Sequence, residues 1–356
     1  MQIEENKPLA PLTTLRIGGP ARWFARAECE DDVEEAAGWA RAHGVPLFVL
    51  GGGSNLLVAD KGFNGLVLQI GIKGVRVSRG EIAADDRVYE VGAGEDWDGF
   101  VRRSVEENCA GLECLAGIPG TVGGTPVQNV GAYGQEVAAV ISRVRAFDLS
   151  EHKYLEFAVI ECGFAYRRSR FNSEDYRRFV LTRVDYRLRS GGAPILRYAE
   201  LQRLFANDAK PSLSEVTTQV RRIRQSKGML LVEGDADCRS AGSFFKNPVV
   251  SAEQVKEIAL VAGKEPPQFT VGEGSHGADL VKVPAAWLIE QAGFSKGYAR
   301  GATGISSRHT LALINHGGAT AGEISALAEE ITQAVEVRFG VRLAMEPICV
   351  GFNGHV

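Results

Sequence analysis

Two glycine-rich stretches are the first candidates for binding chemistry in this chain. The first lies between two apolar runs, residues 47–50 and 56–58. Glycines accept positive φ and carry no Cβ, so their backbone N–H groups can point together into an anion-sized hollow. The pattern predicts a phosphate cradle, with a tight hairpin turn between two buried strands as the alternative. The cradle residues would be Gly51, Gly52, Gly53, Ser54 and Asn55.

The second stretch, residues 111–134, is too rich in glycine and proline for regular structure. Its apolar residues argue against disorder, and long loops in compact domains are usually functional, so we expect it to wrap a ligand with backbone donors rather than form a flexible loop. Two cradles far apart in the sequence suit a large phosphate-bearing cofactor. The second cradle would use Gly117, Pro119, Gly120, Thr121, Gly123, Gly124 and Asn129.

Charged side chains in unusual surroundings are the next candidates. Arg167, Arg168 and Arg170 lie among aromatic residues, where they could grip a carboxylate or phosphate, although a solvated basic loop is the alternative. Glu346 stands in an apolar run, where a carboxylate is costly unless it is paired or functional. Ser243 lies in the compact run 241–248, which could equally be a turn before a strand.

Composition excludes several classes of function. A formal charge of −4 argues against a nucleic-acid partner, and the 6 cysteines and 6 histidines lack zinc-like spacing, so we expect neither disulfides nor a metal. The sequence has no P-loop and no G-x-S-x-G nucleophile elbow. The first glycine stretch lacks the third glycine of a dinucleotide fingerprint, and a G-x-G-x-x-G at Gly272–Gly277 has no βαβ context, so we expect no Rossmann site.

The elements that must position these residues alternate without a strict β-α-β rhythm, which favours an α+β fold over 356 residues, with two or three packed units. No run of about eighteen apolar residues occurs and the start is acidic, so we expect no membrane segment and a cytoplasmic protein. Helices are expected at 30–43, 97–108, 213–227, 285–291 and after a capping box at 320–323, and strands at 46–50, 56–58, 65–70, 74–78, 87–92, 141–149, 154–158, 178–188 and 341–350. The arginines near the end of 213–227 suit the helix dipole.

Six motifs together resemble one family closely, the UDP-N-acetylenolpyruvoylglucosamine reductases of bacterial peptidoglycan synthesis, from Thr13 to about Gly351. The motifs are T-T-L-R-I-G-G at 13–19, G-G-G-S-N-L-L at 51–57, G-I-P-G-T-V-G-G-T-P-V-Q-N-V-G-A-Y-G at 117–134, Y-R-x-S-R-F at 166–171, G-S-F-F-K-N-P at 242–248 and L-x-x-E-P at 343–347. The resemblance implies a vanillyl-alcohol-oxidase/PCMH-type FAD-binding fold: lobes 1–70 and 71–228, then an α+β substrate-binding domain at 229–356. It further implies noncovalent FAD, NADPH as hydride donor, and UDP-GlcNAc-enolpyruvate as the substrate that becomes UDP-N-acetylmuramate. We expect a monomer.

The same resemblance assigns roles to individual residues. Arg167 and Glu346 would polarise the substrate carboxylate and stabilise an enolate-like intermediate, and Ser243 would protonate carbon. Substrate contacts would come from Tyr133, Tyr198, Lys227, Asn247 and Gln291, with Tyr198 on the loop of the longer subclass. Segment 306–309 departs from the subclass pattern, which leaves a role for His309 open. Another flavin oxidase of this fold and a non-catalytic nucleotide-binding protein are the alternatives.

Overall fold

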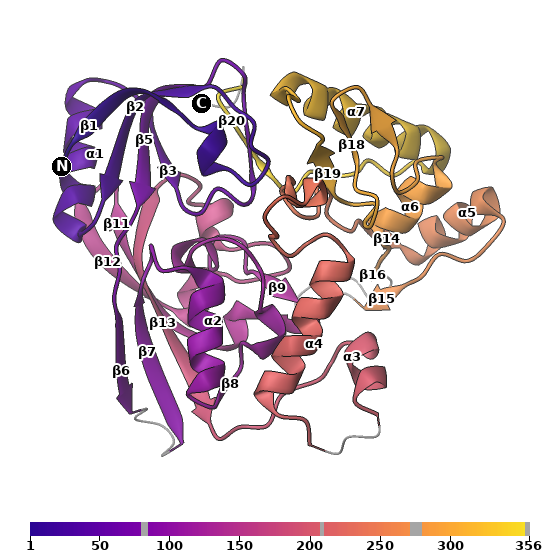
Figure 1. Cartoon of the computed structure of the whole chain (residues 1–356), viewed down its shortest axis with the longest axis horizontal. Helices are drawn as coiled ribbons and strands as arrows, with labels where there is room; N and C mark the ends of the chain where they lie inside the picture. The colour runs from indigo at the N-terminus through magenta and orange to yellow at the C-terminus, as the bar shows by residue number, and fades with distance from the viewer. Residues whose placement is uncertain (80–84, 207–209, 271–279, 353–356) are drawn as a thin grey trace. The chain divides into compact units, whose positions relative to one another are not determined.

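The computed structural model of the chain describes residues 1–79, 85–206, 210–270 and 280–352. These residues form two compact units, each built from separate segments of the chain (Figure 1). The first unit comprises Met1–Lys7, Ala21–Gly52 and Asn64–Ser226, and the second comprises Pro8–Pro20, Gly53–Phe63 and the chain from Lys227.

One half of the first unit is a four-stranded sheet beside a helix. The sheet has the order β1-β2-β5-β3, and β3 pairs with β5 in parallel, with Leu47 opposite Leu66. Helix α1 begins with three acidic residues and buries Val33, Ala36, Ala37 and Ala40 against the sheet, as its 3.6-residue repeat predicts. The elements are β1 (Ile3–Pro8), β2 (Pro20–Ala27), α1 (Glu30–Ala42), β3 (Leu47–Leu50) and β5 (Phe63–Ile70).

The other half of the first unit is a larger antiparallel sheet with the order β12-β11-β13-β7-β6, and β8 pairs with β13. Helices α2 and α4 pack their apolar faces on this sheet, where Trp97, Phe100 and Val220 join a core with Tyr89 and Tyr186. The elements are β6 (Val75–Arg79), β7 (Asp86–Gly92), α2 (Trp97–Glu106), β8 (Cys109–Ala110), β9 (Gly131–Ala132), β10 (Gln135–Glu136), β11 (Ile141–Asp148), β12 (Lys153–Ala158), β13 (Phe179–Ser190), α3 (Ala199–Leu204) and α4 (Leu213–Ser226).

The second unit gathers three helices and short strands around its own core. Helix α7 starts at the predicted capping box, in which the Thr320 hydroxyl accepts from the Glu323 amide and the Glu323 carboxylate accepts from the Thr320 amide. Its apolar face is buried with residues of α5 and α6. The elements are β4 (Leu56–Val58), β14 (Val249–Ser251), α5 (Ala252–Ala262), β15 (Phe269–Thr270), β16 (Leu280–Lys282), α6 (Ala285–Gln291), β17 (Ala299–Arg300), β18 (Thr303–Ile305), β19 (Leu313–Asn315), α7 (Ala321–Phe339) and β20 (Ile348–Val350).

One alternative for the local structure is excluded, and one expectation is wrong. The runs that flank the first glycine stretch are strands, but they do not form a hairpin, since β3 pairs with β5 and β4 pairs with β20. The strand expected over 341–350 is reduced to β20, because residues 340–347 pair only at an isolated bridge between Met345 and Phe245. The Gly272–Gly277 pattern lies outside the described residues. The domain boundaries after residues 70 and 228 stay a prediction.

The described residues lack two features. Among their helices there is none whose length and hydropathy together would let it cross a bilayer. Nor do three or more His, Cys, Asp or Glu side chains in these residues come together in a way that could hold a metal ion.

Candidate functional site

The two glycine stretches touch each other within the first unit. A Cβ built on Gly52 would lie 2.6 Å from the Gly120 Cα, and one built on Gly51 would lie 2.8 Å from the Thr121 Oγ1. A backbone Cα cannot withdraw from such a clash, whereas the end of a threonine side chain can rotate. The structure therefore brings together the two stretches that the sequence singled out, and Gly52 is a glycine because another backbone passes beside it.

Gly117, at the start of the second loop, is held on both sides. Its amide donates to the Asp98 Oδ1 at 2.6 Å, and its carbonyl accepts from the Arg224 Nε at 3.0 Å. Asp98 also forms a 2.5 Å ion pair with Arg221. These bonds fix the loop between the first turn of α2 and the last turns of α4.

Some backbone amides in the rest of this loop donate to carbonyls of the protein, and others are available to bind a ligand. The Val122 and Gly123 amides donate to the carbonyls of Glu95 and Ala93, at 2.9 and 2.8 Å. In the described residues the amides of Gly120 and Thr121 have no such acceptor. A short cradle with two available N–H groups beside a close backbone contact fits a bound phosphate-bearing cofactor. Gly123 serves packing instead, because its Cβ would lie 2.6 Å from the Ala93 Cβ, while a Cβ on Gly124 would meet nothing within 4 Å.

Asn129 braces the end of this stretch. Its Nδ2 donates to the Glu136 Oε2 at 2.9 Å and the Ala165 carbonyl at 3.0 Å, and its Oδ1 accepts from the Ala138 amide at 3.1 Å. The side chain is 1% exposed, so we infer that it shapes the loop rather than meeting a cofactor directly. Its bond to Ala165 also joins the stretch to the turn that carries Arg167.

The three arginines of the aromatic loop have different surroundings. Arg168 pairs with Glu174, and Arg170 pairs with Asp175 at 2.7 Å. Arg167 lies instead at the tip of a tight turn closed by mutual backbone bonds between Ala165 and Arg168, with φ at 55°. Non-glycine residues rarely adopt this left-handed conformation, and residues held in it are often found at functional sites. Of the three arginines, Arg167 is therefore the one whose position is set by the geometry of this turn.

The two candidate tyrosines are in contact. Tyr133 and Gly134 form the two-residue loop of the β9–β10 hairpin, with φ of 50° and 82°. Tyr198 lies just before α3, and its ring meets the Tyr133 ring edge-on, with centroids 5.3 Å apart. Both tyrosines predicted to contact substrate thus form one aromatic pair.

In the second unit, three motifs distant in sequence converge. The Thr14 amide donates to the Gly53 carbonyl at 3.1 Å, and its hydroxyl donates to the Ser240 carbonyl at 2.6 Å. Gly53 has φ at 65°, and a Cβ there would lie 1.9 Å from the Leu12 carbonyl oxygen. Gly53, where the first glycine stretch enters the second unit, therefore lies beside the T-T-L-R segment, and Thr14 of that segment also contacts the chain that enters the Ser243 motif. Ser54 is half-buried in the same turn.

Ser243 and Glu346 lie on neighbouring segments. The Glu346 amide donates to the Phe244 carbonyl at 2.9 Å, and the Lys246 amide donates to the Ala344 carbonyl at 2.9 Å. The Asn55 Nδ2 donates to the Glu346 carbonyl at 3.2 Å. Both Ser243 and Glu346 are half-buried. The backbone pairing therefore brings together the two segments that carry Ser243 and Glu346, whereas Arg167 belongs to the first unit.

The remaining predicted substrate residues lie around α6 and at Lys227, where the longest segment of the second unit begins. The Asn247 Oδ1 accepts from the Ala285 amide at 2.9 Å, so Asn247 holds the first turn of α6, and Gln291 ends the same helix. Lys227 precedes Gly228, whose Cβ would lie 3.1 Å from the Arg308 Nε. The His309 Nδ1 accepts from the Leu311 amide at 3.0 Å, which places the proton of a neutral ring on Nε2.

Arg308 is the centre of a charge cluster in this unit. Its Nε donates to the Asp237 Oδ2 at 2.9 Å, it pairs with Asp235, and the Ser307 hydroxyl donates to Asp237 at 2.7 Å. Burial opposes ionisation of Asp237, but the Ser307 and Arg308 bonds outweigh it and lower the pKa of this carboxyl. The cluster fixes residues 235–238 against segment 306–309.

Comparison with known proteins gives the class first. A family described as "FAD binding domain" matches residues 21–151, which contain both glycine stretches. A second, described as "UDP-N-acetylenolpyruvoylglucosamine reductase, C-terminal domain", matches residues 234–350.

Whole-chain relatives give the family. The chain is 45% identical to a UDP-N-acetylenolpyruvoylglucosamine reductase of Streptomyces coelicolor, over 99% of this chain and 91% of that protein, and 44% identical to one of Thermobifida fusca, over 97% of each. It is similar to the crystal structure of such a reductase (MurB) from Thermus caldophilus, with a TM-score of 0.66 and 25% identity over 98% of this chain and 99% of that chain. The chain belongs to the UDP-N-acetylenolpyruvoylglucosamine reductase family. The predicted family and the predicted α+β FAD-binding fold are confirmed.

Sequence reasoning missed the residues that hold the second loop. Asp98 and Arg224 bind both sides of Gly117, yet Arg224 was expected only to suit a helix dipole. It is instead 7% exposed. The available signal was its position, because Arg224 follows Val216, Val220 and Ile223 on the apolar face of α4.

Proposed function

We propose that this protein is an NADPH-dependent UDP-N-acetylmuramate dehydrogenase, which reduces the enolpyruvyl group of UDP-GlcNAc-enolpyruvate during peptidoglycan precursor synthesis. The observation that most directly supports the proposal is the backbone pairing of the segment that carries Ser243 with the segment that carries Glu346, since these residues are the proton donor and the carboxylate expected of this reaction. The whole-length relatives named for the same activity support it. We further propose that the enzyme is a cytoplasmic monomer.

FAD, when bound noncovalently, would accept a hydride from NADPH and supply it to the vinyl carbon of the substrate. The chain's own residues would handle the charge and the proton. Arg167 would stabilise the negative charge that moves into the substrate carboxylate, and Glu346 would help to orient that group. Ser243 would then deliver a proton to the adjacent carbon, a step for which a positioned acid is needed in a site closed to water.

The substrate-binding residues suit a long, charged ligand. Asn247 and Gln291 lie at opposite ends of α6, whose seven residues span about 9 Å at 1.5 Å per residue, so a ligand that met both would extend along this helix. Lys227 would neutralise a phosphate. Tyr133 and Tyr198 would cover the ligand as an aromatic pair.

The decisive experiment separates the two half-reactions by stopped-flow absorbance of the flavin band. Flavin reduction by NADPH needs no proton donor to substrate carbon, so Ser243→Ala should leave it within about twofold of the wild-type rate. Reoxidation by UDP-GlcNAc-enolpyruvate should slow by about 10²–10⁴-fold, the usual contribution of a general acid. Ser240→Ala is the matched control, because Ser240 lies in the same segment and its hydroxyl accepts from the local Gly242 amide, at 3.3 Å.

Three outcomes would contradict parts of the proposal. Normal reoxidation in Ser243→Ala would end the proton-donor role. Reduced wild-type flavin that reacts with oxygen but not with the UDP-sugar would identify another flavin oxidase of this fold. A colourless wild-type protein that takes up no FAD would leave a nucleotide-binding protein without redox chemistry.

A further inference from the structure

Arg224 is a buried cation that connects two parts of the first unit. It lies in the last turns of α4 and is 7% exposed. Burial lowers the pKa of its guanidinium, while a hydrogen bond with the Tyr133 side chain and the charge of Asp98 oppose this effect. Burying an arginine costs free energy unless its N–H donors are hydrogen-bonded. The buried position of Arg224 therefore depends on the groups that its guanidinium binds.

The guanidinium reaches two segments that are predicted to bind different molecules. Its Nε donates to the Gly117 carbonyl at 3.0 Å, where the second glycine loop begins. The same side chain is hydrogen-bonded to Tyr133, on the β9–β10 hairpin. One rigid, planar group with five donors can satisfy both partners at once, which a lysine cannot do with the same geometry.

The hairpin in turn holds Tyr198. Besides the edge-on ring contact of 5.3 Å, a Cβ on Gly134 would lie 2.8 Å from the Arg197 Cβ, so only a glycine lets the segment with Tyr198 pack so closely on the hairpin tip. The chain just before Tyr198 is also hydrogen-bonded to the rest of the unit, at Ile195. The buried Glu113 accepts from the Ile195 amide at 3.2 Å and from the Gln135 Nε2 of β10 at 2.7 Å.

We propose that Arg224 is a positioning residue that joins the loop starting at Gly117 to Tyr133, and through Tyr133 to Tyr198, so that ordering of the cofactor loop and ordering of the substrate tyrosines are one coupled event. The inference rests on the proposed function for the identity of the two ligands. Because coupling between two sites is reciprocal, FAD binding should order the tyrosine pair, and a UDP-sugar bound beneath the tyrosines should tighten FAD binding.

The first test needs no substrate. Hydrogen exchange is followed for peptides covering residues 117–124, 131–136 and 195–204, in the full chain freed of flavin and again with saturating FAD. In the wild type, FAD should slow exchange in all three segments. In Arg224→Met it should slow exchange in 117–124 only. Arg222→Met, which removes an exposed arginine of the same helix, should behave as the wild type. Equal protection of 131–136 by FAD in Arg224→Met would overturn the inference.

The second test measures dissociation constants for FAD and for UDP-N-acetylmuramate, the proposed product, by fluorescence and flavin difference spectra. Arg224→Met should raise both constants by about 10- to 100-fold, as expected for loss of a charged hydrogen bond, and should abolish the mutual tightening. Tyr133→Phe should raise only the UDP-sugar constant. Arg224→Lys, which keeps the charge, guards against a folding defect and should recover FAD binding but not the coupling.

The two tests distinguish the possible failures. If the wild type binds FAD but no UDP-sugar, the proposed function fails, and the exchange experiment still decides whether Arg224 couples the segments. If the wild type binds both ligands and Arg224→Met weakens only FAD, Arg224 supports the glycine loop alone and the coupling is wrong.

Discussion

Single glycines decide whether the cofactor loops can approach each other. The sequence suggested that glycines leave room for a phosphate, and the structure adds a second cause. At Gly52 and Gly123 the space is already filled by the protein itself, by the Gly120 Cα and the Ala93 Cβ respectively. A side chain at either position would displace a backbone segment or a buried methyl group, whether or not a ligand is bound.

Valine at Gly52 or Gly123 should therefore give colourless protein. The branched Cβ would force the Gly120 backbone or Ala93 away and distort the loop. The measurement is the ratio of flavin to protein absorbance after purification. Gly124→Ala tests whether packing against the protein is the cause. A Cβ at Gly124 meets nothing within 4 Å, so this variant should keep a near-normal flavin content if packing decides the outcome. Full flavin in both valine variants would remove these loops from the cofactor site.

Tyr198 should act on substrate and not on flavin. Tyr198→Ala removes a ring that is 36% exposed and packs on Tyr133, so the loss should raise the substrate dissociation constant by about tenfold, as for an aromatic pair worth about 0.5–1.5 kcal/mol together with its ligand contact. Flavin reduction by NADPH should stay within about twofold of wild type. An unchanged affinity for the UDP-sugar would remove Tyr198 from the substrate site.

At the scale of elements, predictability follows from how local the signal is. Helices α1 and α7 were predictable because their capping boxes and apolar repeats are contained in the segments themselves. The pairing of residues 344–346 with 244–246 was not, because nothing in either segment specifies a partner about a hundred residues away. Arg224 was missed for the same reason, since its acceptors come from Gly117 and the β9–β10 hairpin.

The residues proposed for the site were easier to single out in the sequence than the contacts that hold them in the fold. Ser243, Glu346 and Arg167 stood out through motifs that resemble a family, which carries information no single segment contains. Helix α5, by contrast, belongs to the framework and is hard to recognise in the sequence. Its cap Ser251 accepts from the Gln254 amide at 3.1 Å, yet the apolar residues of α5 include Leu260, which is 85% exposed and weakens the amphipathic pattern.

The Arg308 cluster should stabilise the second unit. Arg308→Met leaves Asp235 and Asp237 without their cation, and Asp237 is 7% exposed, so we expect a loss of about 1–3 kcal/mol in the free energy of unfolding. Urea denaturation measures it. Arg300→Met is the control, because Arg300 is exposed and pairs with Glu330 at the surface, where such pairs contribute little. Equal effects of the two variants would show that the cluster is an ordinary surface network.

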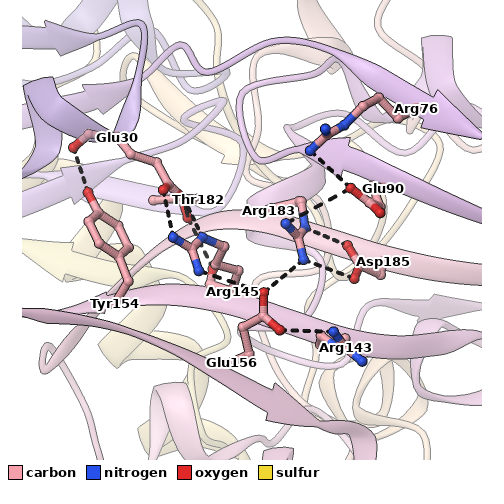
Figure 2. Close-up of polar contacts among 10 residues, drawn as sticks. All are labelled: Glu30, Arg76, Glu90, Arg143, Arg145, Tyr154, Glu156, Thr182, Arg183 and Asp185. Atoms are coloured by element: carbon pink, nitrogen blue, oxygen red, sulfur yellow. Dashed lines mark hydrogen bonds and ion pairs between the residues drawn. The ribbon is translucent and has the colours of Figure 1, made fainter.

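At the scale of the molecule, charge pairs tie the first unit together across five strands and a helix. On one face of the larger sheet, Arg183 pairs with Asp185 and Glu156, and Arg145 joins Glu156 to Glu30 of α1 (Figure 2). Glu30 receives two bonds from Arg145, at 2.8 and 2.9 Å, and one from the Thr182 hydroxyl at 2.7 Å. The full set drawn is Glu30, Arg76, Glu90, Arg143, Arg145, Tyr154, Glu156, Thr182, Arg183 and Asp185.

This network links the helix of the four-stranded half to strands β11 and β13 of the other half, in addition to the apolar core that Phe147 and Val180 share with α1. Burial opposes ionisation of Glu30, but the Arg145 and Thr182 bonds outweigh it and lower the pKa of this carboxyl. In the larger sheet, the Arg178 and Ser150 bonds likewise overcome burial and lower the pKa of Asp148. Both carboxylates should therefore stabilise the fold only while ionised.

The stability of the protein should accordingly fall in acid, and Glu30 should account for part of the fall. A carboxyl whose pKa is lower in the folded state adds stability above its unfolded pKa, about 4.3 for glutamate, and loses it as the pH falls through the folded value. Glu30→Gln should thus lower the melting temperature at pH 7, and its difference from wild type should shrink below about pH 4. Glu34→Gln, an exposed change on the same helix, should follow the wild type throughout. A Glu30→Gln deficit that stays constant down to pH 3 would mean that the loss comes from packing or neutral hydrogen bonds, and that the charge of Glu30 does not hold the two halves together.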